Sequence, residues 1–175
     1  FATNRASYDD MSFAMMQARD FTWGAQLFWE STYILQPEHK EKLKILSNLA
    51  KLRYKCRKYL VEGELIDIIK PINLIPNVSG KWGGWTQPLE DRTLPAVHAA
   101  LWKSIDGSYA AVFANSDDKD HIFDFYLNPS IFTNKKWTIS KVTPNSSETL
   151  KVLPKGNNRL SVRIPGRDGI VLQIK

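Results

Sequence analysis

The chain has 175 residues, of which 43% are hydrophobic and 11% aromatic, and it carries a net charge of +6. This composition is ample for a packed core and excludes an intrinsically disordered protein. The sequence from Phe1 shows no signal peptide and no run of roughly 18 apolar residues, so we expect no membrane partner, although a trimmed precursor or an excised fragment would look the same. The single cysteine, Cys56, permits no internal disulfide and no zinc cluster, and it leaves the compartment undecided.

The first predicted element is a helix. Residues 7–10 read Ser-Tyr-Asp-Asp, a variant of the capping box in which the Ser7 hydroxyl accepts the amide of Asp10. The two aspartates also favour the positive end of a helix. Met11, Met15 and Met16 follow at helical spacing and are predicted to fill the core.

Residues 21–30, Phe-Thr-Trp-Gly-Ala-Gln-Leu-Phe-Trp-Glu, form an almost uninterrupted apolar run between two helical patterns. Continuous hydrophobicity is typical of a strand buried on both faces of a parallel sheet, which predicts a strand over residues 22–29. A parallel strand needs parallel neighbours, so the chain is predicted to be the tail of a larger barrel or open α/β sheet. Gln26 and Glu30 would then lie near the carboxyl end of the last strand, where such folds place their chemistry.

A long basic helix is predicted from Pro37 onward. Between Glu38 and Lys58 eight Lys and Arg residues stand against two Glu, which gives +6 and leaves the rest of the chain neutral. The apolar face of this helix consists of Ile45, Leu49, Leu52, Cys56 and Tyr59. We interpret the basic face as the solvated exterior of a packed helix, with a phosphate-binding surface as the alternative, and expect no nucleic-acid partner. Cys56 is expected to be a buried structural thiol.

From about Gly63 onward the sequence pattern changes to short β-rich runs between turn signals. The predicted strands cover residues 65–69, 96–102, 109–114, 121–127, 137–142, 149–153, 159–164 and 169–174. Asp106-Gly107 supplies a hairpin turn between the second and third of these runs. Short strands at this spacing favour an antiparallel sandwich.

Four segments carry a resemblance to a known class of protein: FTWGAQLFWE, YLVEGELIDIIKP, ALWKSIDGSYAAVFANSDD and GRDGIVLQIK. With these segments the chain resembles the C-terminal part of bacterial glycoside-hydrolase-like proteins, in which a (β/α)8 barrel is followed by an antiparallel β-sandwich. The resemblance implies an α+β fold: the incomplete terminal helix-strand-helix unit of a (β/α) barrel over residues 1–62, followed by an antiparallel β-sandwich over residues 63–175. It also implies a sugar-processing parent enzyme whose catalytic acid and nucleophile lie on strands outside this sequence.

Three residues at the predicted strand end are candidates for substrate binding. If residues of one parity face the barrel interior, Gln26 and Glu30 approach the pocket together. Gln26 could hydrogen-bond a sugar hydroxyl or merely fill the barrel core. Glu30 could bind sugar, assist a partner carboxylate, or be a solvated loop carboxylate. Trp29 offers an aromatic face on which a sugar could stack.

Other chemistry-bearing residues are given structural roles. Trp82 and Trp85 flank Gly83-Gly84 and are predicted to be a packed interdomain plug, with sugar stacking as the alternative. His39, His98 and His121 have no partner at metal-ligand spacing, so we expect structural or surface histidines, no metal and no cofactor. No catalytic residue is assigned.

The leading hypothesis is therefore the C-terminal portion of a carbohydrate-active enzyme that hydrolyses glycosidic bonds. Its partners would be a carbohydrate substrate and the upstream barrel of the same protein, and a secreted or periplasmic location in a bacterium is compatible with it. The alternative is a non-catalytic β-sandwich module that binds carbohydrate or protein. We also expect residues 65–175 to fold independently and residues 1–62 to fold poorly alone, because the predicted strand would expose two unpaired edges.

Overall fold

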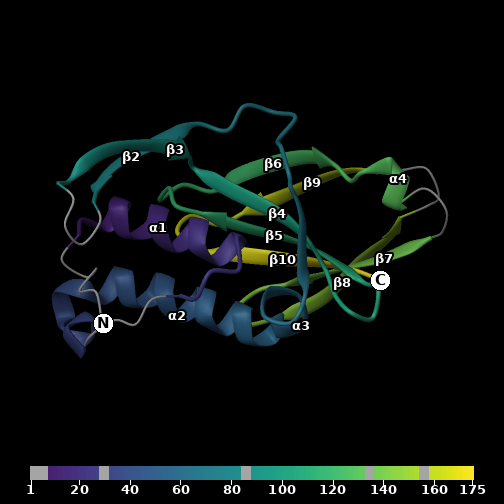
Figure 1. Cartoon of the computed structure of the whole chain (residues 1–175), viewed down its shortest axis with the longest axis horizontal. Helices are drawn as coiled ribbons and strands as arrows, with labels where there is room; N and C mark the ends of the chain where they lie inside the picture. Colours follow the sequence, from purple (N-terminus) through teal and green to yellow (C-terminus); the bar gives the residue numbers. More distant parts are fainter. Residues whose placement is uncertain (1–7, 28–31, 84–87, 133–135, 154–157) are drawn as a thin grey trace.

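The computed structural model describes residues 8–27, 32–83, 88–132, 136–153 and 158–175. They form three layers (Figure 1). The helices α1 (Asp10–Thr22) and α2 (Lys40–Lys55) lie side by side on one face of a six-stranded antiparallel sheet. A two-stranded sheet covers the opposite face, so the centre of the large sheet is buried on both sides.

All the strand pairs among the described residues are antiparallel. The large sheet has the order β1 (Glu64–Ile68), β4 (Val97–Lys103), β5 (Tyr109–Asn115), β10 (Gly169–Ile174), β7 (Trp137–Val142) and β8 (Ser147–Leu153). The covering sheet consists of β6 (His121–Tyr126) and β9 (Arg159–Ile164). A separate hairpin is formed by β2 (Asn77–Trp82) and β3 (Glu90–Pro95). Four short helical turns complete the chain: η2 (Thr32–Leu35), η3 (Pro37–His39), α3 (Arg57–Leu60) and α4 (Pro129–Phe132).

The core between the two sheets is rich in aromatic rings. Along β4, Val97, Ala99 and Leu101 point into this core, whereas Ala100 and Trp102 point to the helical layer, as the two-residue period of a strand requires. The inter-sheet core includes Phe113, Phe123, Phe125, Leu127, Trp137, Ile139, Leu160, Ile164, Ile170 and Leu172. The two sheets thus form an antiparallel sandwich, as predicted from the spacing of the strands.

The helical layer packs on the other face of the large sheet through the apolar face predicted for the basic helix. Ile45, Leu49, Leu52, Cys56 and Tyr59 are all buried, and they share one core with Ala100, Trp102, Val112 and Val171 of the sheet. Cys56 is the buried structural thiol that its position in the apolar stripe predicts.

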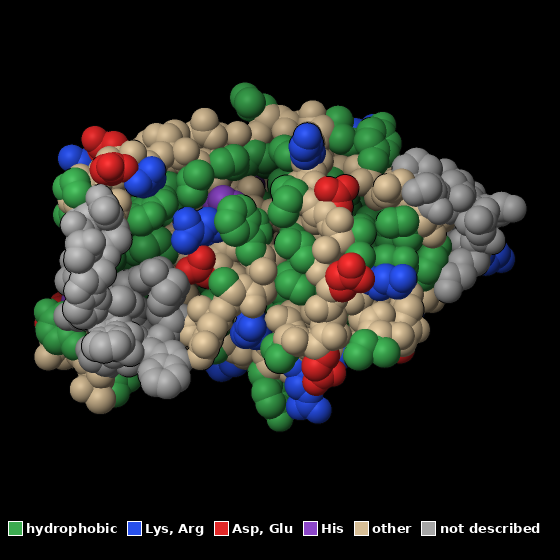
Figure 2. Space-filling view, viewed as in Figure 1, with side chains coloured by type: hydrophobic (Ala, Val, Ile, Leu, Met, Phe, Trp, Pro, Cys, Tyr) green, Lys and Arg blue, Asp and Glu red, His purple; other side chains and the backbone are tan. Residues whose placement is uncertain are grey.

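The basic face of α2 is only partly a solvated exterior. Asn48 Nδ2 donates to Asp168 Oδ2 at 3.1 Å, Lys55 Nζ donates to the Thr143 carbonyl at 3.2 Å, and Lys58 Nζ donates to Asp106 Oδ2 at 2.7 Å. These acceptors lie in loops of the sandwich. On the face shown in Figure 2, Lys and Arg side chains are interspersed with Asp and Glu and do not gather into one basic patch.

Helix α1 begins at Asp10 and is capped by Asp9. The Asp9 carboxylate accepts the Ser12 amide at 2.8 Å and the Ser12 hydroxyl at 2.7 Å. Burial by itself raises the pKa of Asp9, but the bonds from Ser12 outweigh this effect and lower it below its ordinary value. Ser7, which we predicted as the cap, lies outside the described residues. Met15 and Met16 fill the core as predicted, whereas Met11 is only half-buried.

The prediction of a strand over residues 22–29 is wrong for the part that the structure describes, residues 22–27. Thr22 is the last residue of α1, Gly24 adopts a positive φ of 70°, and residues 25–27 form no strand. Phe28, Trp29 and Glu30 lie outside the described residues. The reason is physical: a parallel strand is stabilised by neighbours on both sides, and every strand pair within the described part of this chain is antiparallel. The described elements within residues 8–27 and 32–60 are all helical.

The eight strands predicted after Gly63 are all present, with ends within two residues of the predicted ones. The Asp106-Gly107 turn also forms, with Gly107 at φ +78° and the Ser108 amide bonded to Asp106 Oδ1 at 3.0 Å. The hairpin of β2 and β3 was not predicted. It rests on α1 where Gly80 approaches Ser12 and Met15, and the Lys81 amide donates to Ser12 Oγ at 2.7 Å. None of the helices in the described ranges has the length and apolarity needed to cross a membrane.

Candidate functional site

Gln26 lies in the loop after α1 and its side chain is exposed. It lines a groove of about 400 Å³ with Leu27, Ala50, Arg53, Tyr54, Arg57 and Val61. Arg53 holds the loop in place by donating to the carbonyls of Gly24 at 3.1 Å and Ala25 at 3.0 Å. Gln26 therefore lies at the outer side of α2 beside two guanidinium groups, and not on a strand. Trp29 and Glu30, the other two predicted substrate-binding residues, lie outside the described residues.

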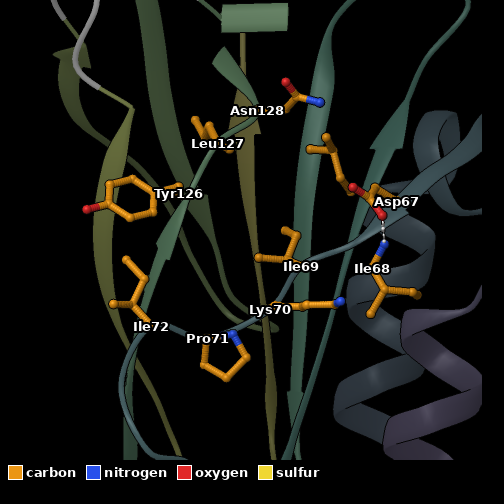
Figure 3. A pocket seen from close by; sticks show the side chains of 10 residues that line it. Asp67, Ile68, Ile69, Lys70, Pro71, Ile72, Tyr126, Leu127 and Asn128 are labelled. Carbon is orange, nitrogen blue, oxygen red and sulfur yellow. Dashed lines mark hydrogen bonds between the residues drawn. The ribbon is translucent and has the colours of Figure 1, made fainter. Parts of the chain in front are cut away.

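A larger groove, of about 520 Å³, lies where a connecting segment crosses from one sheet to the other (Figure 3). We call residues 67–73, which comprise the last two residues of β1 and the segment that follows it, the strap, and we call this hollow the strap groove. Its lining consists of Asp67, Ile68, Ile69, Lys70, Pro71, Ile72, Leu101, Tyr126, Leu127 and Asn128. The residues come from the strap, from β4 and from β6 with the turn after it, so segments far apart in sequence build one surface.

Hydrogen bonds fix the strap to both sheets. The Ile69 amide donates to the Ala99 carbonyl of β4 at 3.1 Å, and the Ile72 amide donates to the Asp124 carbonyl of β6 at 2.7 Å. The Asn73 side chain then bridges to β6, donating to the Ile122 carbonyl and accepting the Asp124 amide, both at 2.8 Å. The strap groove is therefore preformed, because both of its walls are tied to the sandwich.

The strap groove combines apolar and polar side chains. Tyr126, which is 57% exposed, lies on one side, and Asp67 and Lys70 lie on the other (Figure 3). Asp67 Oδ1 accepts the amide of the next residue, Ile68, at 2.8 Å, which orients the carboxylate. Sequence reasoning missed this site. The available signals were an aromatic residue at a strand end and a Lys-Pro step in a connection.

A third groove, of about 310 Å³, contains two carboxylates. Glu62 and Glu64 line it together with Gly63, Lys103, Ser104 and Ile105. Both carboxylates are exposed and come from one short segment, and Glu62 lies 3.9 Å from Arg57 Nε. Glycoside hydrolysis needs two carboxyl groups on opposite sides of the bond, one of them with a pKa raised by its surroundings. None of these three grooves provides such a pair among the described residues.

The three histidines occupy separate places. His39 is buried against Tyr33, with ring centroids 4.6 Å apart, and His121 Nε2 lies 2.8 Å from Asp117 Oδ2. The described residues contain no group of three His, Cys, Asp or Glu side chains that could hold a metal ion. Trp82 is half-buried in β2, whereas Trp85 lies outside the described residues.

His98 makes stability depend on pH. Burial, and secondarily the positive charge of Arg19, lower the pKa of His98 from 6.5 to about 4. Between pH 6.5 and pH 4, His98 is protonated in the unfolded chain but remains neutral in the folded chain. The free energy of unfolding therefore falls as the pH falls from 6.5 toward 4. Between pH 7.5 and 5.0 we expect His98 to account for a loss of about 2 kcal/mol in urea denaturation.

The matched variant for this prediction is His98→Gln, which is neutral at both pH values. Its free energy of unfolding should change less between the two pH values than that of the wild type. An equal change in both proteins would show that His98 does not cause the effect.

Comparison with known proteins gives one relative of the chain by sequence. A putative glycoside hydrolase of Bacteroides thetaiotaomicron is 28% identical over 114 residues, which cover 64% of this chain and 16% of that protein. The resemblance to glycoside-hydrolase-like proteins is thus confirmed. No protein-family model matches the chain. The matched part of the chain spans about one sixth of the length of this relative.

Solved structures similar to the chain include two from bacilli. A GH27 β-L-arabinopyranosidase from Geobacillus stearothermophilus has a TM-score of 0.46 and 10% identity, covering 95% of this chain and 30% of that one. A putative α-N-acetylgalactosaminidase from Bacillus halodurans has a TM-score of 0.46 and 12% identity, covering 95% and 32%. A GH30 endoxylanase from Clostridium papyrosolvens has a TM-score of 0.40 and 11% identity, covering 99% and 39%.

Proposed function

We propose that this chain is the C-terminal portion of a carbohydrate-active enzyme that hydrolyses glycosidic bonds. In this proposal residues 1–62 are the end of the catalytic barrel and residues 63–175 are the accessory β-sandwich. The observation that carries the proposal is the sequence similarity to a putative glycoside hydrolase. The match covers only 16% of the length of that protein. The antiparallel sandwich with a helical layer on one face is compatible with this role.

In this proposal the catalytic carboxylates lie elsewhere in the parent protein, and the three described grooves, which lack a catalytic pair, are compatible with that. A glycosidase needs its acid and its second carboxylate on either side of the bond, and the exposed Glu62 and Glu64 do not meet this need. The helical layer would then contribute the closure of the barrel. The loop that holds Gln26 would contribute a wall of its pocket.

The test compares the longer parent protein with the 175-residue chain on a panel of aryl glycosides and oligosaccharides. We expect the parent to release sugar and the chain alone to release none. Hydrolysis by the chain alone would contradict the placement of the catalytic carboxylates outside it. A folded parent that hydrolyses no member of a broad panel would contradict the enzyme hypothesis and favour the non-catalytic binding module.

The substrate-binding roles of Gln26, Trp29 and Glu30 belong to the same proposal. Replacing Gln26 with Leu keeps the approximate size but removes a donor and an acceptor, which leaves sugar hydroxyls unpaired. In the parent we expect kcat/KM to fall by about fivefold to a hundredfold, which corresponds to roughly 1–3 kcal/mol. Glu30→Gln should also retain residual turnover, since neither residue is assigned as nucleophile.

Steady-state kinetics would measure this effect, with thermal melts to show that each variant folds. Ala50→Ser, in the wall of the same groove, is the matched control because it leaves the Gln26 amide in place. Unchanged kcat/KM in folded Gln26→Leu and Glu30→Gln variants would leave this segment with a structural role only.

A further inference from the structure

We propose that the strap groove binds a neutral saccharide on the flank of the sandwich. This inference rests on the proposed carbohydrate-active function and adds a binding site to it. The carrying observation is that a preformed hollow of about 520 Å³ holds an exposed aromatic ring together with a small number of polar side chains. Pockets of this size with few polar groups are typical of small-molecule sites.

The first argument is preorganisation. A ligand that orders a mobile loop loses affinity to the ordering of that loop. The strap groove avoids this cost because the Ile69 and Ile72 amides are bonded to β4 and β6, and Asn73 makes two further bonds to β6. Pro71 further restricts the backbone between the two anchor points.

The second argument is the match between the lining and the two kinds of surface of a sugar ring. Buried Leu101 and Leu127 and half-buried Ile69 provide an apolar floor for the C–H face of the ring. The Tyr126 ring, 57% exposed, provides a flat wall. Asp67 and Lys70 provide an acceptor and a donor, which suits hydroxyl groups.

The third argument concerns charge and the class of ligand. Asp67 and Lys70 contribute one charge of each sign, so the lining has no net charge that would select an anion or a cation. A neutral saccharide therefore fits this lining better than an acidic sugar.

The test is a titration of the 175-residue chain with cellobiose, xylobiose and galacturonic acid, followed by two-dimensional amide NMR. We expect the neutral disaccharides to shift the amides of residues 67–72 and 126–128, with weaker effects from the acidic sugar. Tyr126→Ala should raise the Kd about tenfold, as loss of one stacking wall implies. Lys70→Met should also weaken binding while keeping the apolar stem.

Tyr33→Ala is the matched control, because Tyr33 is also an exposed tyrosine, at 38%, and lines none of the three grooves. Its Kd should equal that of the wild type. Absence of shifts at the strap groove, shifts caused only by galacturonic acid, or equal weakening by Tyr33→Ala would each overturn the inference.

Binding is measured here without turnover, so the two proposals fail separately. If the parent hydrolyses glycosides but the amides of the strap groove do not shift, the proposed function is supported and the proposed binding site is wrong. Binding at the strap groove together with an inactive parent supports the site and removes the proposed hydrolysis.

Discussion

Removal of residues 1–62 is expected to turn the sandwich into an aggregating protein. The helical layer covers the centre of one face of the large sheet, chiefly β4, β5 and β10, and without it an apolar surface becomes exposed. That surface consists of Ala100, Trp102, Ala110, Val112, Ala114, Val142 and Val171, all of them buried in the intact chain. Contiguous apolar patches of this kind drive association.

Expression of residues 63–175 beside the full chain, followed by size-exclusion chromatography and dye binding, would measure this effect. We expect the shortened chain to elute as aggregates or remain insoluble. A version with Val112→Ser and Val171→Ser should recover solubility in part, since it makes the exposed face more polar. A monomeric 63–175 that unfolds cooperatively would show that the helices are dispensable.

This expectation differs from the one drawn from the sequence, in which residues 65–175 fold independently. The reason is that α1 and α2 share a core with the sheet, through Phe13, Phe21, Leu49, Leu52 and Tyr59. The division of the chain between residues 62 and 63 remains a prediction about its domains.

Phe113→Ala is expected to lower the free energy of unfolding by about 3–5 kcal/mol. The Phe113 side chain is fully buried at the centre of the sandwich, and its ring centroid lies 5.3 Å from that of Phe123 and 5.2 Å from that of Phe125. Truncation removes both ring contacts and leaves a cavity that the surrounding strands cannot close.

Urea denaturation of the full chain would measure the loss. Ile105→Ala is the control, because Ile105 is 89% exposed at the hairpin turn and its removal should change stability by less than about 0.5 kcal/mol. A loss below about 1 kcal/mol for Phe113→Ala would mean that the neighbouring rings collapse into the vacated space.

Elements whose environment follows from their own local pattern could be predicted from the sequence. The apolar stripe of α2 and the strands β7 and β9 are examples, since periodicity alone marks their buried faces. β3 could not be predicted because it is exposed along most of its length and carries no buried period. The run over residues 22–29 failed for another reason: its pattern is that of a strand buried between parallel neighbours, and the described part of this chain has none.

The candidate sites also differ in whether they follow from a local sequence pattern. Gln26, Trp29 and Glu30 were placed by assuming a strand, so their arrangement depended on an element that does not form over residues 22–27. The strap groove joins Lys70 to Tyr126 across a separation that no local motif spans. Its existence depends on how β6 covers the large sheet, which periodicity does not specify.

The thiol of Cys56, the single cysteine of the chain, can serve as a built-in probe of opening of the helical layer. Burial raises the pKa of Cys56 to about 11, and the side chain is 0% exposed at the C-terminal end of α2, with Gln173 Nε2 of β10 3.9 Å from its sulfur. A thiol reagent can therefore reach it only in molecules in which the helical layer has separated from β10. The rate of Cys56 alkylation in native buffer therefore measures this opening directly, without an introduced probe or denaturant.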